Sequence, residues 1–311
     1  MIKITHDKQQ DRFYEGEVRL ATKKWRDIYH SIFFIAPAYI LFTTMLTIPL
    51  LLSFYYALTD WNGATEANWV GLQNFVRAFT DDPSFANSFW FTARYAFICL
   101  ILSNIIGIIF ALALTTQIRS KNILRTVFFM PNLIGGIILG FIWQFVFTKA
   151  VPSIGSATNI GLFNLPWLGD APTAFWATVI VFVWQMGGYL MVIYIAAIEG
   201  VDRSLYESSQ IDGANLLQVI TKITLPLIAP AFTICIFLSL AWGFKTFDSI
   251  YSLTKGGPFG STESVTINIY EEAFLRNNAG FGTAKALIFF AVIVAVTLIQ
   301  VAISKRREVQ M

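Results

Sequence analysis

Residues Tyr95–Ile118 read YAFICLILSNIIGIIFALALTTQI, a run of 24 residues without aspartate, glutamate, lysine or arginine. A helix needs about 20 residues to cross roughly 30 Å of hydrocarbon, and one charge at the bilayer centre costs at least about 2.5–3.5 kcal/mol. This run is therefore predicted to be a transmembrane helix. A buried helix of a soluble protein is disfavoured, because apolar runs there are usually about 10–14 residues long.

Working outward, five further windows of 19 to 32 residues also lack charges: Ile28–Thr59, Thr126–Thr148, Ala171–Ile198, Ile223–Phe244 and Ala286–Ser304. Charged residues make up 13% of the chain and hydrophobic residues 56%, against about 25% charged in soluble proteins. We therefore predict an all-α integral membrane protein with six transmembrane helices. The predicted spans are about 32–58, 95–118, 126–148, 173–198, 223–244 and 286–304.

The lysines and arginines predict the orientation of these spans, because cytoplasmic connections carry an excess of them. The N-terminal tail 1–27, the second and fourth connections and the C-terminal tail 305–311 together hold fifteen basic residues, and the other connections hold seven. Both termini and the loop 199–222 are therefore expected in the cytoplasm, with a six-span domain over 28–304 between the tails. A multi-pass protein of a cytoplasmic membrane is predicted.

Several classes of function are disfavoured by what the connections contain. The glycine-rich stretch Gly256–Thr262 lacks the lysine of a phosphate-binding loop, so the chain is not expected to hydrolyse nucleotide alone. His6 and His30 have no second ligand nearby, and no metal site is expected. Cys99 and Cys235 fall within predicted spans and are expected to be free thiols.

The fourth connection is the most informative, because it is acidic although the charge rule places it in the cytoplasm. Ser204-Leu205-Tyr206-Glu207 has the spacing of a capping box at a helix start. Asp212-Gly213 then indicates a helix end, since glycine accepts the left-handed conformation. A second amphipathic stretch, Ala214–Thr224, leads to Pro226. Two interpretations remain open: this pair of helices covers the end of the bundle, or it docks onto a cytosolic partner.

A family resemblance rests on this loop. Glu207-Ser208-Ser209, Gly213 and Ile223-Thr224-Leu225-Pro226 have the spacing of a known signature, Glu-Ala-Ala, three residues, Gly, nine residues, Ile-x-Leu-Pro. The segment resembles the signature loop of permease subunits of binding-protein-dependent ABC importers. The chain departs from the pattern in having two serines for the two alanines, which keeps both residues small.

Further stretches resemble one branch of that family. Leu253–Pro258, Asn268–Phe274 and Gly280–Ala286 are similar to carbohydrate-importing permeases related to the maltose permease, and the resemblance runs from Phe34 onward. The chain differs from the maltose permease in having six predicted spans, not eight, and no large inserted domain. The resemblance implies a type I ABC importer permease fold with a cytoplasmic coupling helix.

The resemblance also implies roles for residues of the loop. The coupling helix of the family sits in a cleft of a cytosolic ATPase, and ATP binding there switches the spans between inward-open and outward-open states. The implied coupling residues are Glu207, Ser208, Ser209, Asp212, Gly213 and Ala214. Glu207 has an alternative role as a capping residue, and the two roles are compatible.

The resemblance implies partners as well, and a complex larger than this chain. ATP and Mg would be bound by the ATPase, so this chain is expected to be a non-catalytic subunit without a cofactor of its own. The implied partners are two ATPase subunits, a second permease that is a paralogue or a copy, an extracytoplasmic solute-binding protein, a sugar and membrane lipid. No nucleic-acid partner is expected.

Polar and aromatic groups within the fourth and fifth windows are candidates for the transport path, because such groups are costly inside a membrane and sugars stack on rings. Tyr189 follows Gln185 by four residues, and Ser239, Trp242 and Thr246 share a helical face. The resemblance implies sugar contacts at Gln185, Met186, Tyr189, Ser239, Trp242, Gly243 and Thr246. Lys245 is added as a candidate that either faces solvent with Asp248 or meets an acidic sugar or a phosphate.

The sequence bears on three alternatives to a sugar-importing ABC permease. A stand-alone secondary transporter or channel is disfavoured because no predicted span contains an aspartate or glutamate for ion coupling. A membrane-embedded enzyme lacks a recognisable nucleophile–base pair. An ABC importer for an acidic sugar, a sugar phosphate or glycerol phosphate remains open. The carbohydrate-type stretch around Gly256–Pro258 disfavours peptides and polyamines.

Overall fold

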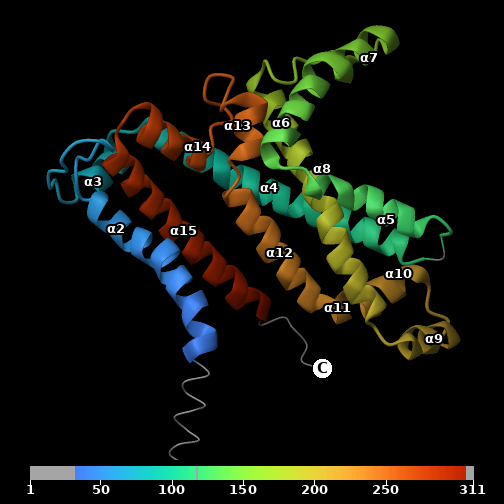
Figure 1. The fold of residues 1–311 in the computed structure, drawn as a ribbon. Coiled ribbons are helices and arrows are strands. Elements are labelled where there is room, and N and C mark those ends of the chain that lie inside the picture. Colours follow the sequence, from blue (N-terminus) through green and yellow to red (C-terminus); the bar gives the residue numbers. More distant parts are fainter. Residues whose placement is uncertain (1–31, 117, 306–311) are drawn as a thin grey trace, which may run out of the picture. The chain divides into compact units, whose positions relative to one another are not determined.

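Helices make up nearly all of the secondary structure in the computed structural model, which describes residues 32–116 and 118–305 (Figure 1). No strand forms within those two ranges, and Thr59 and Trp69 make an isolated antiparallel bridge. A helix satisfies its own backbone hydrogen bonds, which hydrocarbon cannot do. The predicted tail 1–27, both histidines and all but the first residue of the predicted tail 305–311 lie outside the described residues.

Five helices of the described ranges are long and apolar enough to cross a membrane, and a bent pair of helices gives six if the pair forms one span. They are Ile32–Tyr56, Pro83–Leu114, Gly136–Thr158, Ala171–Glu199, Ala279–Ser304 and the pair Leu216–Leu227 with Ala229–Phe244. The predicted all-helical class is confirmed. The orientation of the termini stays a prediction, and the bounds of several helices differ from the charge-free windows.

The chain divides into two units, Met1–Tyr55 and Tyr56–Met311, which are described separately. The described part of the first unit is helical and includes the π-helical turn η1 (Thr43–Thr47) and most of α2 (Ile48–Tyr56). No residue of η1 or α2 is buried. The apolar side chains of this helix are therefore available to lipid.

The core of the second unit lies between α4 (Pro83–Leu114) and α8 (Ala171–Glu199), with α12 (Ala229–Phe244) packed against α4. Glycines allow close approach at these contacts. A Cβ on Gly107 would lie 3.0 Å from the Leu190 Cβ, and one on Gly243 would lie 3.1 Å from the Ala96 Cα. Small residues commonly have this role between membrane helices. Both cysteines are free and buried in this core.

Helix α4 begins twelve residues before the predicted span 95–118. The Asp82 side chain caps it by accepting from the Phe85 amide at 3.0 Å, and Pro83 occupies the first turn. Proline is well suited to a first turn because its missing N–H would have no partner there. Arg94 consequently lies within the helix, with its guanidinium 4.4 Å from the centre of the Phe175 ring. The charge-free window thus locates hydrocarbon and not the helix ends.

The segment predicted as the span 126–148 is divided. Helix α5 (Lys121–Phe129) ends in a 3-10 turn, η2 (Met130–Leu133), that contains Pro131. The chain continues as α6 (Gly136–Phe145), a π-helical turn η3 (Val146–Ala150) and α7 (Val151–Thr158). Proline removes a backbone donor and clashes with the preceding turn, so one apolar window holds parts of two helices.

The fifth predicted span, 223–244, is bent at Ile228. The helical segment Leu216–Leu227, which ends in the short α11 (Leu225–Leu227), meets α12 at 71°, with Pro226 and Pro230 on either side of the bend. Helix α15 (Ala279–Lys305) begins seven residues before the predicted span 286–304. It therefore includes Lys285, which the charge criterion had assigned to a connection.

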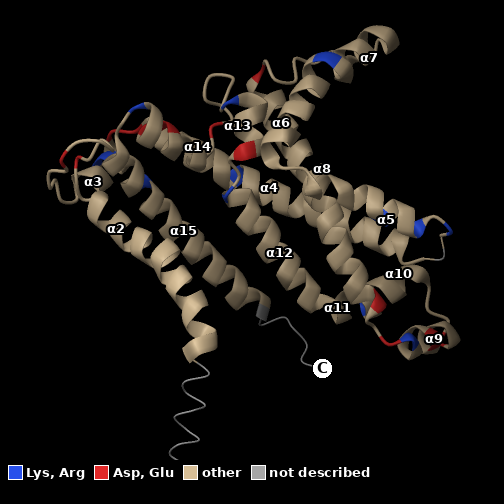
Figure 2. Ribbon diagram, in the orientation of Figure 1, with Lys and Arg blue, Asp and Glu red and all other residues tan. Residues whose placement is uncertain are grey.

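Short helices occupy the connections: α3 (Gln73–Thr80), η4 (Gly161–Asn164), α9 (Arg203–Ile211), α10 (Leu216–Val219), η5 (Ile220–Thr224), α13 (Asp248–Thr254), α14 (Val265–Tyr270) and η6 (Glu271–Leu275). In Figure 1, α9 and α10 lie at one end of the second unit, and α13 and α14 lie at the other. Figure 2 shows the charged residues gathered at these ends, with α12 uncharged along its length.

Candidate functional site

The loop between α8 and α12 forms two helices joined at a glycine. Helix α9 ends at Ile211 with Asp212 as its C-cap, and Gly213 has a φ of +73°. The amides of Gly213 and Ala214 donate to the carbonyl oxygens of Gln210 and Ser209, at 3.1 and 2.9 Å, and so close the helix end. The predicted helix end at Asp212-Gly213 is confirmed. Glycine is favoured here because other residues rarely adopt this conformation.

The predicted capping box at Ser204 and Glu207 is wrong. The N-cap of α9 is Asp202, whose carboxylate accepts from the Ser204 amide at 2.9 Å. Hydrogen bonds from the Ser204 amide and hydroxyl lower the pKa of Asp202. A capping box is present instead at the start of α10, between Asn215 and Gln218. Because Asp202 lies two residues upstream and caps equally well, Glu207 is left exposed without a hydrogen-bonding partner among the described residues.

The six predicted coupling residues fall on two faces. Glu207, Ser208, Asp212 and Gly213 are exposed, and a Cβ on Gly213 would meet no atom within 4 Å. Ser209 is buried and donates its hydroxyl to the Tyr206 carbonyl oxygen at 2.7 Å. Ala214 is half-buried. The exposed residues are available to a partner, whereas Ser209 packs toward its own chain.

Exposed apolar side chains on the same loop were missed by the sequence analysis. Ile211 is 87% exposed, Leu216 76% and Leu217 70%. Exposed apolar residues at the end of a bundle are candidates for contact with a partner protein or a membrane surface. The available signal in the sequence was the position of these residues beside the acidic and glycine residues of a polar connection.

The root of the loop is held by an ion pair. Arg125 Nη2 lies 2.6 Å from Glu199 Oε1 at the end of α8, and it also donates to the Leu114 carbonyl oxygen at 3.0 Å. Cations are favourable near the last carbonyl groups of a helix. Arg125 therefore ties the ends of α4 and α8 to α5, at the point where the loop begins.

A stack of aromatic rings joins α5, α8 and α12. The Tyr189 and Trp242 rings are stacked with centroids 5.4 Å apart and an interplanar angle of 21°. Phe129 stacks on Tyr189 at 6.4 Å, and Gln185, one turn along α8, donates to the Ile134 carbonyl oxygen at 3.1 Å. Tyr189 and Gln185 are half-buried and Trp242 is exposed. These rings offer a surface on which a sugar ring can stack.

The other predicted path residues lie inside the bundle. Met186 is 1% exposed, Gly243 packs on Ala96, and Thr246 is buried. Ser239 donates to the Cys235 carbonyl oxygen at 2.7 Å and accepts from Asn104 at 3.0 Å. Tyr194, which was not predicted, completes this buried network by donating to Asn104 at 2.6 Å. A sugar-binding role for these residues stays a prediction.

Two helix breaks lie side by side next to the aromatic stack. One separates η2 from α6 and the other separates α12 from α13. A Cβ on Gly136, the first residue of α6, would lie 2.7 Å from the Cβ of Asp248, the first residue of α13. Ser252 also contacts Gly136. Discontinuous helices commonly mark transport sites, because their free ends present polar groups at membrane depth. The Pro131 and Gly135-Gly136 pattern inside an apolar window was the available signal.

Lys245 and Asp248 are both exposed at the second break. Lys245 ends α12 one turn beyond Trp242, and no ion pair joins it to any described residue. The structure therefore does not bring Lys245 and Asp248 together as a pair.

A buried ionic cluster at the end of the molecule with α14 was also missed. Lys285 has no exposed surface, and its Nζ lies 2.6 Å from Asp82 Oδ2 and 3.2 Å from Glu272 Oε2. It donates to Asn268 at 2.9 Å and lies over the Phe281 ring. The cluster joins the start of α4, η6 and α15.

The two carboxylates of this cluster are held in their charged form. Desolvation raises the pKa of Asp82, but hydrogen bonds from Lys285 and the Phe85 amide, together with the Lys285 charge, lower it overall. Desolvation likewise raises the pKa of Glu272, and the Asn278 hydrogen bond with the Lys285 and Arg276 charges lowers it. Among the described residues, no group of three or more His, Cys, Asp or Glu side chains is placed to hold a metal ion.

Comparison with known proteins agrees with this architecture. Residues 103–309 match the family model described as binding-protein-dependent transport system inner membrane component. The chain is 45% identical over 278 residues to the probable starch degradation products transport system permease protein AmyD of Thermoanaerobacterium thermosulfurigenes, covering 89% of this chain and 94% of AmyD. It is 31% identical to the multiple sugar-binding transport system permease protein MsmF of Streptococcus mutans, over 84% of this chain and 90% of MsmF.

Among solved structures, a chain of a bacterial ABC transporter involved in the import of the acidic polysaccharide alginate superimposes with a TM-score of 0.79. It is 23% identical, and the match covers 91% of this chain and 99% of that one. The fold is therefore that of an ABC importer permease. The protein belongs to the family of binding-protein-dependent transport system inner membrane components, which confirms the resemblance drawn from the signature loop.

Proposed function

We propose that this chain is the transmembrane permease subunit of an ATP-driven ABC importer for a sugar or oligosaccharide. The observation that carries the proposal is the exposed loop of α9, Gly213 and α10 in a member of this family. The names of the relatives, which refer to starch degradation products and multiple sugars, support the substrate class. The chain itself is a non-catalytic subunit in this proposal.

The loop is the proposed contact with a cytosolic ATPase, which supplies the site for ATP and Mg. Exposed Glu207 and Asp212 offer charges to a basic partner, and Ile211 offers apolar area. The orientation follows from the basic residues, so both termini and the loop are cytoplasmic. One loop engages one ATPase, so a second permease subunit is required to engage the other ATPase of the pair.

Transport in this proposal is an alternating-access cycle. A solute-binding protein delivers the sugar on the outer side, and closure of the two ATPases on ATP shifts the spans between inward-open and outward-open states. The sugar passes the stack of Tyr189 and Trp242 beside the two helix breaks. Rings of this kind bind the apolar faces of sugars, while Gln185 supplies hydrogen bonds.

A second candidate substrate is an acidic sugar or a sugar phosphate. The specific observation that favours it is Lys245, exposed one turn beyond Trp242 and without an ion-pair partner among the described residues. An unpaired cation beside a stacking surface suits an anionic sugar. Competition between maltooligosaccharides and uronic-acid oligosaccharides for uptake distinguishes the two substrates.

The proposal is tested by reconstituting the permease pair in proteoliposomes with and without the ATPase subunits. With ATPase, ATP inside and binding protein outside, labelled oligosaccharide should accumulate. Without ATPase, uptake should fall to the level of empty vesicles. Uptake by this chain alone would show a stand-alone transporter and would overturn the proposal.

A further inference from the structure

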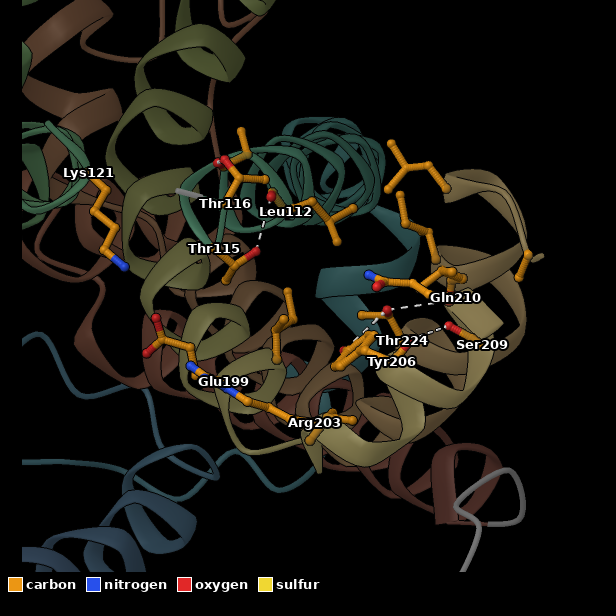
Figure 3. A pocket seen from close by; sticks show the side chains of 17 residues that line it. Leu112, Thr115, Thr116, Lys121, Glu199, Arg203, Tyr206, Ser209, Gln210 and Thr224 are labelled. Atoms are coloured by element: carbon orange, nitrogen blue, oxygen red, sulfur yellow. Dashed lines mark hydrogen bonds between the residues drawn. The ribbon is translucent and has the colours of Figure 1, made fainter. Parts of the chain in front are cut away.

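A cavity of about 1050 Å³ lies behind the loop, between the ends of α4 and α8 and the inner side of α9 and η5 (Figure 3). Its walls include apolar side chains at the ends of the bundle helices, such as Leu112, Ala113 and Ile198, and others from the loop, such as Val219 and Ile220. It is therefore separate from the face that carries Glu207 and Ile211.

Two cations without partners line the same cavity. Lys121, at the start of α5, is half-buried, and Arg203 is at the start of α9. Neither has an ion-pair partner among the described residues, since the Glu199 carboxylate in the lining is paired with Arg125. Figure 3 shows Lys121, Glu199 and Arg203 at one end of the cavity and Gln210, Ser209 and Thr224 toward the other. In this view the Glu199 carboxylate lies between Lys121 and Arg203, and because it is paired with Arg125, two unpaired cations remain at this end of the cavity.

The hydroxyl groups of the lining are already in use. Thr115 and Thr116 donate to main-chain carbonyl oxygens of α4, at 3.0 and 2.6 Å, and Ser209 donates to Tyr206. A neutral polyol would consequently find few free donors here. Lys121 and Arg203 remain free, and both favour an anion.

The size and the apolar walls distinguish between anions. A free phosphate ion replaces only a few waters, at about 30 Å³ each, and would leave most of the cavity unfilled. A phospholipid places its phosphate between two cations and its acyl chain along apolar walls. Basic pockets between transmembrane helices on the cytoplasmic side are suited to anionic headgroups.

We propose that this cavity binds an anionic phospholipid, with Lys121 and Arg203 holding the headgroup phosphate beside the Arg125–Glu199 pair and an acyl chain against Leu112, Ala113 and Ile198. This lipid-site proposal rests on the proposed cytoplasmic orientation of the loop. It requires no assumption about the transported solute. The lipid would support the inner side of α9 while the outer side contacts the ATPase.

The test uses the assembled complex, delipidated in detergent and titrated with phosphatidylglycerol or phosphatidylcholine, with retained lipid counted by native mass spectrometry. Each cation near an anionic headgroup contributes roughly a five-fold gain in affinity. The double variant Lys121→Gln, Arg203→Gln should therefore bind phosphatidylglycerol about 30-fold more weakly. The matched control, Arg119→Gln with Lys222→Gln, changes the same charge at exposed residues outside the cavity and should bind as the wild type does.

A second variant keeps the test independent of the charged pair. Ala113→Phe fills part of the apolar wall, keeps both cations and should also reduce retention. Equal retention in the wild type and the double variant would overturn the proposal, as would equal binding of phosphatidylcholine. Displacement of the lipid by inorganic phosphate at the same concentration would identify a free-anion site and overturn the lipid assignment. Failure of ATP-driven uptake with lipid binding intact would count against the proposed function alone.

Discussion

At the end of the second unit that carries α14, a lysine without exposed surface is paired with two carboxylates from two other elements. At the opposite end, Glu207 and Asp212 are exposed and have no ion-pair partner among the described residues, and Ile211 is 87% exposed. Figure 2 shows charges at both ends, so composition alone does not separate them. What differs is whether each charge has its partner within the chain.

This difference separates a fixed end from a docking end. Buried charges stabilise a fold only when they are paired and hydrogen-bonded, so the Lys285 cluster holds α4, η6 and α15 in one arrangement. Exposed charges and apolar side chains at the loop contribute little to the isolated chain, and their partners belong to another protein. Variants at the two ends should accordingly affect stability at the first and assembly at the second.

The largest effect is expected for Lys285→Met. Removal of the ammonium leaves the Asp82 carboxylate without an ion-pair partner and leaves Glu272 with Arg276 alone. Breaking a buried pair in this way costs about 3–5 kcal/mol. The thermal midpoint of the purified chain in detergent should fall sharply. Arg276→Met is the control, because Arg276 also pairs with Glu272 but is half exposed. Equal thermal midpoints for the wild type and Lys285→Met would contradict the claim that the Lys285 cluster stabilises this end of the second unit.

Acid should remove part of the stabilisation free energy that the Lys285 cluster contributes to the fold. The pKa values of Asp82 and Glu272 are lowered in the folded chain. Groups with lowered pKa values contribute stability above their unfolded values, about 4, and lose it as the pH falls through the folded values. The midpoint should therefore drop below about pH 4. Asp82→Asn should show a shallower drop, and an identical pH profile for both proteins would exclude the cluster as the cause.

A smaller effect, confined to assembly, is expected for Gly213→Val. A left-handed conformation costs a non-glycine residue about 1–2 kcal/mol. In the exposed loop of the free chain valine is expected to relax to another conformation, so this cost arises on docking and corresponds to roughly five- to thirty-fold weaker association with the ATPase. Copurification with the ATPase measures the loss, and insertion and midpoint should be unchanged. Gly213→Asn is the matched control, since asparagine tolerates this conformation. If both variants copurify normally with the ATPase, the loop is not the docking element.

The smallest effect is expected for Trp242→Ala, which removes one ring of the Tyr189 stack. Ring contacts contribute about 0.5–1.5 kcal/mol beyond burial, so half-maximal uptake should require about two- to ten-fold more substrate. Association with the ATPase should not change. Trp90→Ala is the control, because Trp90 is exposed on α4 and absent from the stack. An unchanged concentration dependence for Trp242→Ala would remove the ring from the transport path.

Periodic and local features were readable from the sequence. The charge-free windows predicted the apolar helices because the free energy of placing a charge in hydrocarbon is large at every position. The end of α9 was predicted because glycine alone adopts its backbone conformation readily. The capping box was misplaced because Asp202 and Ser204 are both good caps, and the choice depends on where the last turn of α8 leaves the chain.

Pairings between distant segments were not readable. Lys285 and Asp82 are about two hundred residues apart, and the charge criterion assigned both to connections. Ser239 and Trp242 lie on one helix, yet Ser239 is buried and accepts a hydrogen bond from Asn104, whereas the Trp242 side chain is exposed. Three residues make nearly one turn, so the periodicity could not separate these two environments.

The sequence by itself determined that this chain lies in a membrane and belongs to the permease family, because the free energy of burying a charge and the backbone preference of Gly213 act locally. Only the tertiary structure decided which charges are neutralised inside the chain, where the helix breaks meet beside Tyr189, and which side of α9 encloses a cavity. These features depend on contacts between segments far apart in the chain. Such contacts produce no periodic pattern in the sequence from which they could be predicted.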